Sequence, residues 1–243
     1  VNQLKLSTYF SRKKLLLATT GGTIFAFLLQ IIALGTNHWL TFEIPNGLFY
    51  NKTGRYLYQS YSGLWRVCKV EFTKDTNQLR GETRTYHESC VNHNLFPSEV
   101  ELYQDPSLDM KILDYMRTGT AFGIIALTVM LIGHMFALYA LRRPRYIVKR
   151  LTALIHFMTA ACVLVENEVF IRRTEYAKSK LPLRLPKQAD HSYGYSFVLS
   201  WISFVFFLAA GMIFLFTSHK RKSDNLNDQM DELEIDEPVA IRR

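Results

Sequence analysis

The sequence predicts a membrane α+β protein, with four transmembrane helices and a small extracellular antiparallel β-sheet between the first and second helices. Apolar residues are gathered into four segments that each reach the ~20 residues needed to cross a hydrocarbon core. The long polar stretch between the first two segments contains runs rich in aromatic and β-branched residues, which are typical of strands. Because only 49% of the chain is hydrophobic, the clustering carries the prediction and the average does not.

The four apolar segments are residues 15–35, 119–141, 151–171 and 197–217. The first resembles a signal peptide because Arg12, Lys13 and Lys14 precede it. A signal-peptide core has only about 7 to 15 apolar residues and ends at a small-residue cleavage site. This segment is longer and runs into Asn37-His38-Trp39, so we expect a retained membrane span.

Basic residues around the spans predict that both termini lie in the cytosol, because positively charged flanks favour that side. Twelve basic residues support this orientation: Lys5, Arg12, Lys13, Lys14, Arg142, Arg143, Arg145, Lys149, Arg150, Lys220, Arg221 and Lys222. Six in the loop between spans three and four oppose it: Arg172, Arg173, Lys178, Lys180, Arg184 and Lys187. The net charge of +8 follows from this topology plus one basic outer loop, without a nucleic-acid partner.

The expected organisation alternates between the two sides of the plasma membrane. It comprises a cytosolic N-terminus (1–14), span one (15–35), extracellular loop one (36–118), span two (119–141), a cytosolic turn (142–150), span three (151–171), extracellular loop two (172–196), span four (197–217) and a cytosolic tail (218–243). Seven acidic residues predict that the tail is disordered: Asp224, Asp228, Asp231, Glu232, Glu234, Asp236 and Glu237.

Two of the three cysteines, Cys68 and Cys90, fall in loop one, and Cys162 falls in span three. An extracellular loop is oxidising, so we expect a Cys68–Cys90 disulfide. A metal site that adds His87 or His93 is the competing interpretation, but the spacing matches no usual zinc pattern, and we expect no metal or cofactor. The same loop holds the N-glycosylation sequon Asn51-Lys52-Thr53.

Four stretches of loop one predict strands: Trp39–Ile44, Tyr56–Tyr61, Leu64–Phe72 and Thr83–Val91. Asp75, Asn77 and Gly81 supply turn chemistry between the last two. We expect a small antiparallel sheet that sits on the helices and is closed by the disulfide. A short helix is expected after Pro97, with Ser98 as its cap.

The stretch Ser62-Gly63-Leu64-Trp65-Arg66-Val67-Cys68, followed by Cys90 in the first loop of a four-span chain, resembles the signature of the claudin and peripheral myelin protein superfamily. The upstream sequon and the 22-position step between the cysteines look most like the voltage-gated calcium-channel gamma subunits, because claudins have a much shorter step. This branch includes the stargazin-like auxiliary subunits of glutamate receptors.

Two further segments are similar to the gamma branch, namely Cys162–Val169, which carries glutamates near the outer end of span three, and His191–Phe197, which leads into span four. The resemblance implies a claudin-like fold: a left-handed four-helix bundle under a sheet of about five strands, the last one near Tyr193. Stargazin-like proteins usually end in a PDZ-binding motif. This sequence ends in Ala240-Ile241-Arg242-Arg243, so PDZ anchoring is not expected.

Within the motif, Trp65 has three interpretations: a receptor contact, a lipid-interface anchor, or packing under the sheet against the helix tops. Its place beside Cys68 on an aromatic strand favours packing. Gly63 is then expected to meet a backbone requirement.

Glu166 and Glu168 lie near the outer end of span three and, being two positions apart, point to different faces of the helix. Only one of them is expected to face the bundle, because an unpaired charge in the membrane is costly. The resemblance aligns the family's glutamate with Glu168. We therefore expect Glu168 to bond the loop domain or Arg172 and Arg173, and Glu166 to lie nearer solvent or a partner helix.

Other polar residues lie deeper in the spans. His134 and His156 are expected to bond a neighbouring helix as neutral imidazoles, since no chain of partners for a proton relay is found. Gln30 is expected to hold helices together through an interhelical hydrogen bond. Small residues that permit close helix approach are Gly21, Gly22, Ala26, Ala209, Ala210 and Gly211, and either an internal helix or a channel helix can be the neighbour.

The sequence contains no catalytic motif such as Gly-x-Ser-x-Gly or His-Glu-x-x-His, so we expect no enzyme. The resemblance implies an auxiliary subunit that binds a pore-forming channel among membrane lipids and changes its gating or surface delivery. A voltage-gated calcium channel is the first candidate partner and an ionotropic glutamate receptor the second. The alternative function is a claudin-like adhesion or barrier protein that self-associates through its extracellular loops.

Overall fold

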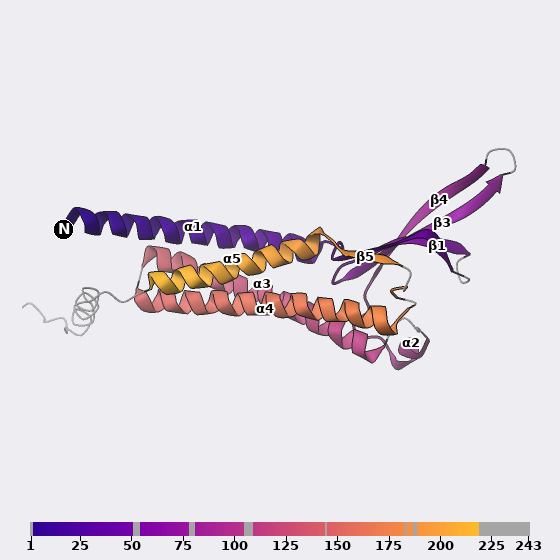
Figure 1. Cartoon of the computed structure of the whole chain (residues 1–243). Helices are drawn as coiled ribbons and strands as arrows, with labels where there is room; N and C mark the ends of the chain where they lie inside the picture. The colour runs from indigo at the N-terminus through magenta and orange to yellow at the C-terminus, as the bar shows by residue number, and fades with distance from the viewer. Residues whose placement is uncertain are drawn as a thin grey trace, which may run out of the picture.

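The computed structural model has a bundle of four long helices with a β-sheet at one end (Figure 1). It describes residues 2–50, 54–77, 81–104, 109–143, 145–182, 184–186 and 189–218. The sequon Asn51–Thr53 and the acidic tail lie outside the described residues, so the predictions made for them stay predictions.

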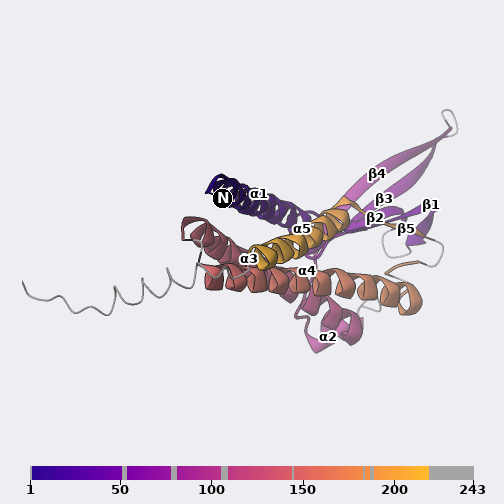
Figure 2. The same ribbon diagram turned by 60° about the vertical axis from the view of Figure 1, so that its left-hand side comes forward.

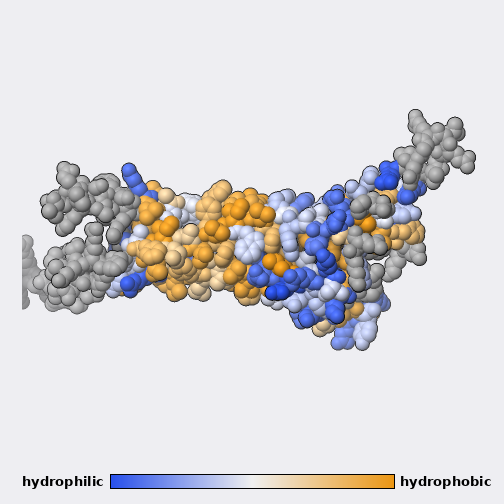
Figure 3. Space-filling model, viewed as in Figure 1, coloured by the Kyte–Doolittle hydropathy of each residue, from blue (hydrophilic) through white to orange (hydrophobic). Residues whose placement is uncertain are grey.

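The long helices are α1 (Asn2–Gly35), α3 (Met110–Arg142), α4 (Tyr146–Lys180) and α5 (Tyr195–Thr217). All four contain a stretch long and apolar enough to cross a membrane. On the face drawn in Figure 3, apolar residues form a band over the helices, and hydrophilic residues gather toward the sheet. The expected number of four long apolar helices is therefore present, and α3 and α4 continue beyond the predicted apolar segments toward the sheet.

Small side chains set how closely the helices approach. Ala26 of α1, Ala126 of α3 and Ala160 of α4 are buried in one cluster with Val163 and Phe207. In lipid there is little hydrophobic drive between helices, so association depends on such close van der Waals packing. At Gly211 of α5, an added Cβ would lie 2.9 Å from the Phe157 ring, so this crossing needs a glycine.

The sheet has five antiparallel strands in the order β4-β3-β2-β1-β5. They are β1 (Leu40–Tyr50), β2 (Arg55–Ser62), β3 (Arg66–Asn77), β4 (Gly81–Asn92) and β5 (Asp190–Tyr193). The edge strand β5 comes from the second outer loop and pairs with the start of β1. Both the four predicted strands and the fifth strand near Tyr193 are thus present.

The bundle-facing side of the sheet lies on the outer ends of α3 and α4. Phe42, Ile44 and Leu57 of the sheet are buried in one cluster with Ile112 of α3 and Ala177 of α4. Beyond this contact the β3–β4 hairpin extends away from the helices (Figure 2). All described side chains of β4 are exposed, so β4 is held by its pairing with β3, which also pairs with β2, and by one covalent link.

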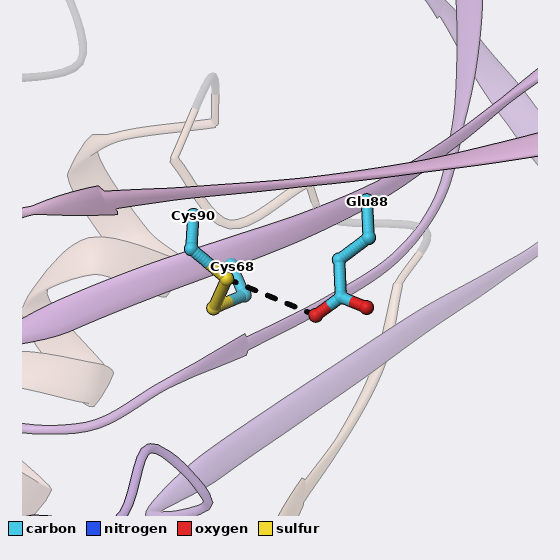
Figure 4. Close-up of side chains that lie close together, drawn as sticks. All are labelled: Cys68, Glu88 and Cys90. Carbon is cyan, nitrogen blue, oxygen red and sulfur yellow. Dashed lines mark hydrogen bonds between the residues drawn. A yellow bond between two sulfur atoms is a disulfide. The ribbon is translucent and has the colours of Figure 1, made fainter.

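That link is a disulfide between Cys68 of β3 and Cys90 of β4, which are directly paired across the two strands (Figure 4). Glu88 lies beside it, with Oε1 3.7 Å from Cys90 Sγ, and accepts a hydrogen bond from the Tyr61 hydroxyl. Bonded sulfurs are not thiolates, and thiolates are what bind metals. With the two sulfurs bonded to each other, neither is available as a thiolate ligand.

A one-and-a-half-turn helix, α2 (Glu99–Gln104), follows the sheet. The Glu101 backbone N–H donates to Ser98 Oγ, and the Ser98 backbone N–H donates to Glu101 Oε2. This reciprocal pair is a capping box and satisfies two otherwise unpaired donors. Ser98 is therefore the cap that the sequence predicts.

Removing either sulfur of the Cys68–Cys90 disulfide should reduce delivery of the protein to the cell surface. A lost disulfide in a small extracellular domain costs about 2–5 kcal/mol, and β3 and β4 have no second layer to hold them. Surface biotinylation of Cys68→Ser and Cys90→Ser measures this. Cys162→Ser removes the free thiol in α4 and is the matched control, expected to stay near wild type. Normal surface levels for all three variants would show that the bond is dispensable.

Candidate functional site

The junction between sheet and bundle begins at a turn that ends β2, where Gly63 lies against the end of α1. The Gly63 N–H donates to the Arg66 carbonyl at 2.9 Å and closes the turn. An added Cβ would lie 2.7 Å from the Thr36 carbonyl oxygen and 2.9 Å from Asn37 Cα. Both contacts are backbone, which has little freedom to move aside. The backbone requirement expected at Gly63 is this close approach.

Two tryptophans satisfy carbonyl groups at the C-terminal end of α1. The last four carbonyls of any α-helix have no partner within the helix. Trp39 Nε1 donates to the Ala33 carbonyl at 2.7 Å, and Trp65 Nε1 donates to the Leu34 carbonyl at 2.9 Å. Thr36 bonds the Ile32 carbonyl through both its backbone N–H and its hydroxyl. The end of this span is therefore closed by side chains from two parts of the loop.

Leu64 and Trp39 are the side chains that enter the top of the bundle. Both are buried with Phe170 of α4 and Phe197 of α5, and the Trp39 ring lies 5.0 Å from that of Phe170. Trp65 contacts the end of α1 as expected but keeps 38% of its surface exposed. Arg66 stays on the outer surface, where its Nε donates to Asn92 Oδ1.

A buried arginine and a histidine join α4 to the same junction. Arg173 Nη2 donates to His93 Nε2 at 3.1 Å, and the guanidinium lies over the Phe170 ring. The backbone N–H of His93 donates to the Trp65 carbonyl at 2.7 Å. Burial is the main cause that lowers the pKa of His93 to about 2, with the charges of Arg173 and Arg184 adding to it. The imidazole is therefore a neutral acceptor for Arg173.

The start of α5 closes the junction from the other side. The Gly194 N–H donates to the Trp39 carbonyl, and the Ser196 N–H donates to the His38 carbonyl. A Cβ at Gly194 would overlap the carbonyl oxygen of His38. The hydroxyls of Thr36 and Ser196 are 2.7 Å apart, so α1 and α5 are joined at the sheet end of the bundle.

Below this junction a buried polar cluster joins three helices. Gln30 Nε2 of α1 donates to Glu166 Oε2 of α4 at 3.0 Å and lies 3.4 Å from Ser200 Oγ of α5. Ser200 Oγ donates to Asn167 Oδ1 at 2.7 Å. The side chains of all four residues are fully buried. Inside a membrane such hydrogen bonds hold helices together, because no water competes for the groups.

α3 meets this polar cluster through a small cavity and a glycine. The cavity of about 10 Å³ is lined by Thr120, Glu166, Phe170 and Arg173, among others. Thr120 Oγ1 and Glu166 Oε1 have no hydrogen-bond partner among the described residues. At Gly123 an added Cβ would lie 3.0 Å from Glu166 Oε1 and 3.0 Å from Leu34 Cδ2. α3 thus contacts the polar cluster without donating a hydrogen bond to it.

Comparison with known proteins decides the family. The sequence model described as "PMP-22/EMP/MP20/Claudin tight junction" matches residues 24–216. The chain belongs to this family. The match begins within α1, ends near the end of α5, and includes the sheet, the junction and the polar cluster.

Among relatives of this claudin-family chain, the voltage-dependent calcium channel gamma-3 subunit of Rattus norvegicus is 28% identical over 204 residues, which cover 82% of this chain and 59% of the relative. The gamma-5 subunit of Mus musculus is 25% identical over 219 residues, 86% of this chain and 72% of the relative. The chain therefore spans less than two thirds of the gamma-3 relatives' length. The family is non-enzymatic, in line with a site built for packing.

The expectation for the two glutamates of this claudin-family protein was the wrong way round. Glu166 is fully buried and bonds Gln30, whereas Glu168 is exposed. The buried face of α4 repeats through Val163, Glu166 and Phe170, and Glu168 points about 200° away from Glu166 on a helix. Neither Arg172 nor Arg173 bonds Glu168, since Arg172 pairs with Glu175 and Arg173 with His93.

The expectation that both histidines bond a neighbouring helix was also wrong. His134 Nδ1 lies 2.6 Å from the Met130 carbonyl of its own helix. Both ring nitrogens of His156 lack a hydrogen-bond partner within the described part of the chain. Phe207 lies near both imidazoles, at 6.2 and 5.7 Å between ring centroids. The histidines pack as aromatic rings between helices, and Gln30 alone of the three links neighbouring helices by hydrogen bonds.

Sequence reasoning missed several residues of the junction and cluster. Asn167 and Ser200 were not selected, although Asn167 is next to Glu166. Arg173 was counted as a loop charge and as a possible partner of Glu168, and His93 was counted only as a metal candidate. Arg173 and His93 are bonded to each other but lie 80 positions apart in the sequence, so no local pattern could pair them. The period of the apolar residues Ala160, Val163 and Phe170 was the signal that could have placed Glu166 inward.

Gly123→Ala should destabilise the bundle. The new methyl would press on Glu166 Oε1 and Leu34, and overpacking of a well-filled core costs about 1–3 kcal/mol. The measurement is the midpoint of thermal unfolding in detergent. Gly21→Ala is the matched control, because a Cβ there meets nothing within 4 Å. Equal midpoints for the two variants would contradict the close contact of α3 with the polar cluster.

The unfolding free energy of the sheet domain, which contains His93, should fall as the pH is lowered below about 6.5. The unfolded chain protonates His93 near its ordinary pKa of 6.5, whereas the folded chain resists protonation down to about 2. The unfolded state then binds more protons, so stability is full above pH 6.5 and decreases toward pH 2. The His93 share of the slope is up to about 1.4 kcal/mol per pH unit.

Denaturant unfolding between pH 7.5 and 4.5 tests this dependence. His93→Gln keeps an acceptor for Arg173 but does not titrate. The slope of its unfolding free energy against pH should therefore correspond to about one proton fewer than in wild type. His87→Gln removes an exposed histidine of β4 and serves as the control. If His93→Gln and wild type lose stability in parallel, another group governs the dependence.

Proposed function

We propose that this chain is an auxiliary subunit that binds a pore-forming ion channel and changes its gating or its delivery to the surface. The observation that carries the proposal is its similarity to calcium channel gamma subunits over 82–86% of its length. A voltage-gated calcium channel is the first candidate partner, and an ionotropic glutamate receptor is the second.

The structure offers two kinds of surface for such a partner. One is the outward apolar face of the helices, for example Leu28 of α1 and Met135 of α3, which are 52% and 71% exposed. The other is the β3–β4 hairpin, which extends beyond the bundle (Figure 2). A regulator acts only through different affinities for the channel's states. Contacts at these surfaces therefore have to differ between open and closed channels.

The proposal includes residence in the plasma membrane with both termini in the cytosol. The basic turn between α3 and α4 lies at the end of the bundle opposite the sheet (Figure 1). The disulfide belongs to the sheet end, which suits an oxidising exterior. Positive charge at one end and a disulfide at the other support the same orientation.

A second candidate is an adhesion or barrier protein that self-associates through the extracellular loops. The tight-junction wording of the matching family model favours it. The exposed edge strand β4 adds a physical argument, because an unpaired edge can pair with a second copy. The 22-residue separation of the cysteines, which departs from claudins, favours the auxiliary subunit instead.

Affinity purification from native membranes tests the proposal. The tagged chain is recovered in mild detergent and the partners are identified by mass spectrometry. We expect a pore-forming channel subunit in stoichiometric amount. The same tagged chain is imaged in cells that lack such channels, where it should spread evenly. Strands of protein at cell contacts, with no channel subunit recovered, would replace the auxiliary role with the adhesion role.

A further inference from the structure

The glutamate that the bundle does not use, Glu168 of α4, lies on the outward face of that helix. It is exposed, and no hydrogen bond or ion pair joins it to another described side chain. The outward stripe continues toward the cytosolic end through Val165, Ala161, Met158 and Leu154, of which Met158 and Leu154 are more than half exposed. From Leu154 to Val165 this face is apolar, and Glu168 is the first charged residue on it, followed further out by Arg172 and Glu175.

The depth of Glu168 follows from the neighbouring helix. Asn167 bonds Ser200, so Glu168 lies at the level of Ser200. Ser200 comes five residues after the first residue of α5, or about 7 Å along the helix. α5 has 23 residues and so spans about 34 Å, little more than the ~30 Å hydrocarbon core. Glu168 therefore lies within the outer leaflet, below the water boundary.

The cations nearest to Glu168 on its own helix are already engaged. Arg172, one turn further out, pairs with Glu175 at 3.0 Å. Arg173 points to the other side and bonds His93. A charged side chain at this depth is costly unless it is paired, and such residues generally find partners in neighbouring helices. Among the described residues no cation is paired with Glu168, so this carboxylate is open to a partner from outside the chain.

We propose that the outward stripe of α4 is the docking face for a transmembrane helix of the pore-forming subunit, and that this helix places an arginine or lysine against Glu168. Charge complementarity selects this occupant, since the stripe offers apolar packing along its length and one anion near its outer end. The inference rests on the proposed function and specifies which face of the chain the channel contacts.

Quantitative affinity purification from channel-expressing cells tests the docking face. Glu168→Gln keeps the shape and removes the charge, and we expect about tenfold less pore-forming subunit per tagged chain, as for a desolvated charge pair. Glu168→Lys should reduce recovery further. Glu99→Gln changes an exposed glutamate of α2, outside the stripe, and is the control that should recover channel like wild type. Surface biotinylation checks that every variant reaches the membrane.

A photo-crosslinking amino acid at position 168 provides a second readout that does not depend on affinity. The crosslinked peptide should come from a transmembrane helix of the channel and contain a basic residue. Replacing that residue by glutamate should restore recovery with Glu168→Lys. Wild-type recovery by Glu168→Gln, or crosslinks only to lipid or to a second copy of this chain, would overturn the docking face. Absence of any channel with the wild-type chain would overturn the proposed function as well.

Discussion

The unpaired carbonyl groups at the end of α1 are the constraint on which the outer half of the molecule depends. Trp39 and Trp65 meet these carbonyls with their indole N–H groups, and this fixes where the chain leaves the membrane and where the β2–β3 turn returns to it. Gly63 lets the two backbones touch, and Leu64 enters the bundle between them. The sheet is thereby attached to α1. β5 in turn pairs with β1, and the start of α5 bonds the residues just before β1.

Much of this architecture is predictable from the chain because local chemistry determines it. Span length follows from the thickness of the hydrocarbon core, the strands follow from aromatic and β-branched runs, and the disulfide follows from two cysteines in one extracellular loop. The need for glycine at position 63 was also anticipated. Each of these features depends on residues close in sequence or on the surrounding solvent, so no knowledge of distant contacts is required.

The rotation of the helices was the part that sequence reasoning failed to predict. Glu166 and Glu168 are chemically identical, and their roles differ only because α4 turns one of them toward Gln30 of α1. The contact joins residues 136 positions apart. His134 and His156 show the same limit, since neighbouring phenylalanines make them packing groups. A resemblance to a family supplied the motif but gave the wrong rotation of α4.

The hydrogen bonds of Gln30 have a consequence for biogenesis. Span one is made first, yet its amide finds its partners only in α4 and α5, the last two spans of the chain. Until those spans arrive, the amide faces lipid or the insertion machinery, where an unsatisfied polar group is unfavourable. The bundle therefore cannot mature helix by helix. A nascent chain that stops after two spans carries an exposed polar group, which is a chemical mark by which quality control can recognise incomplete protein.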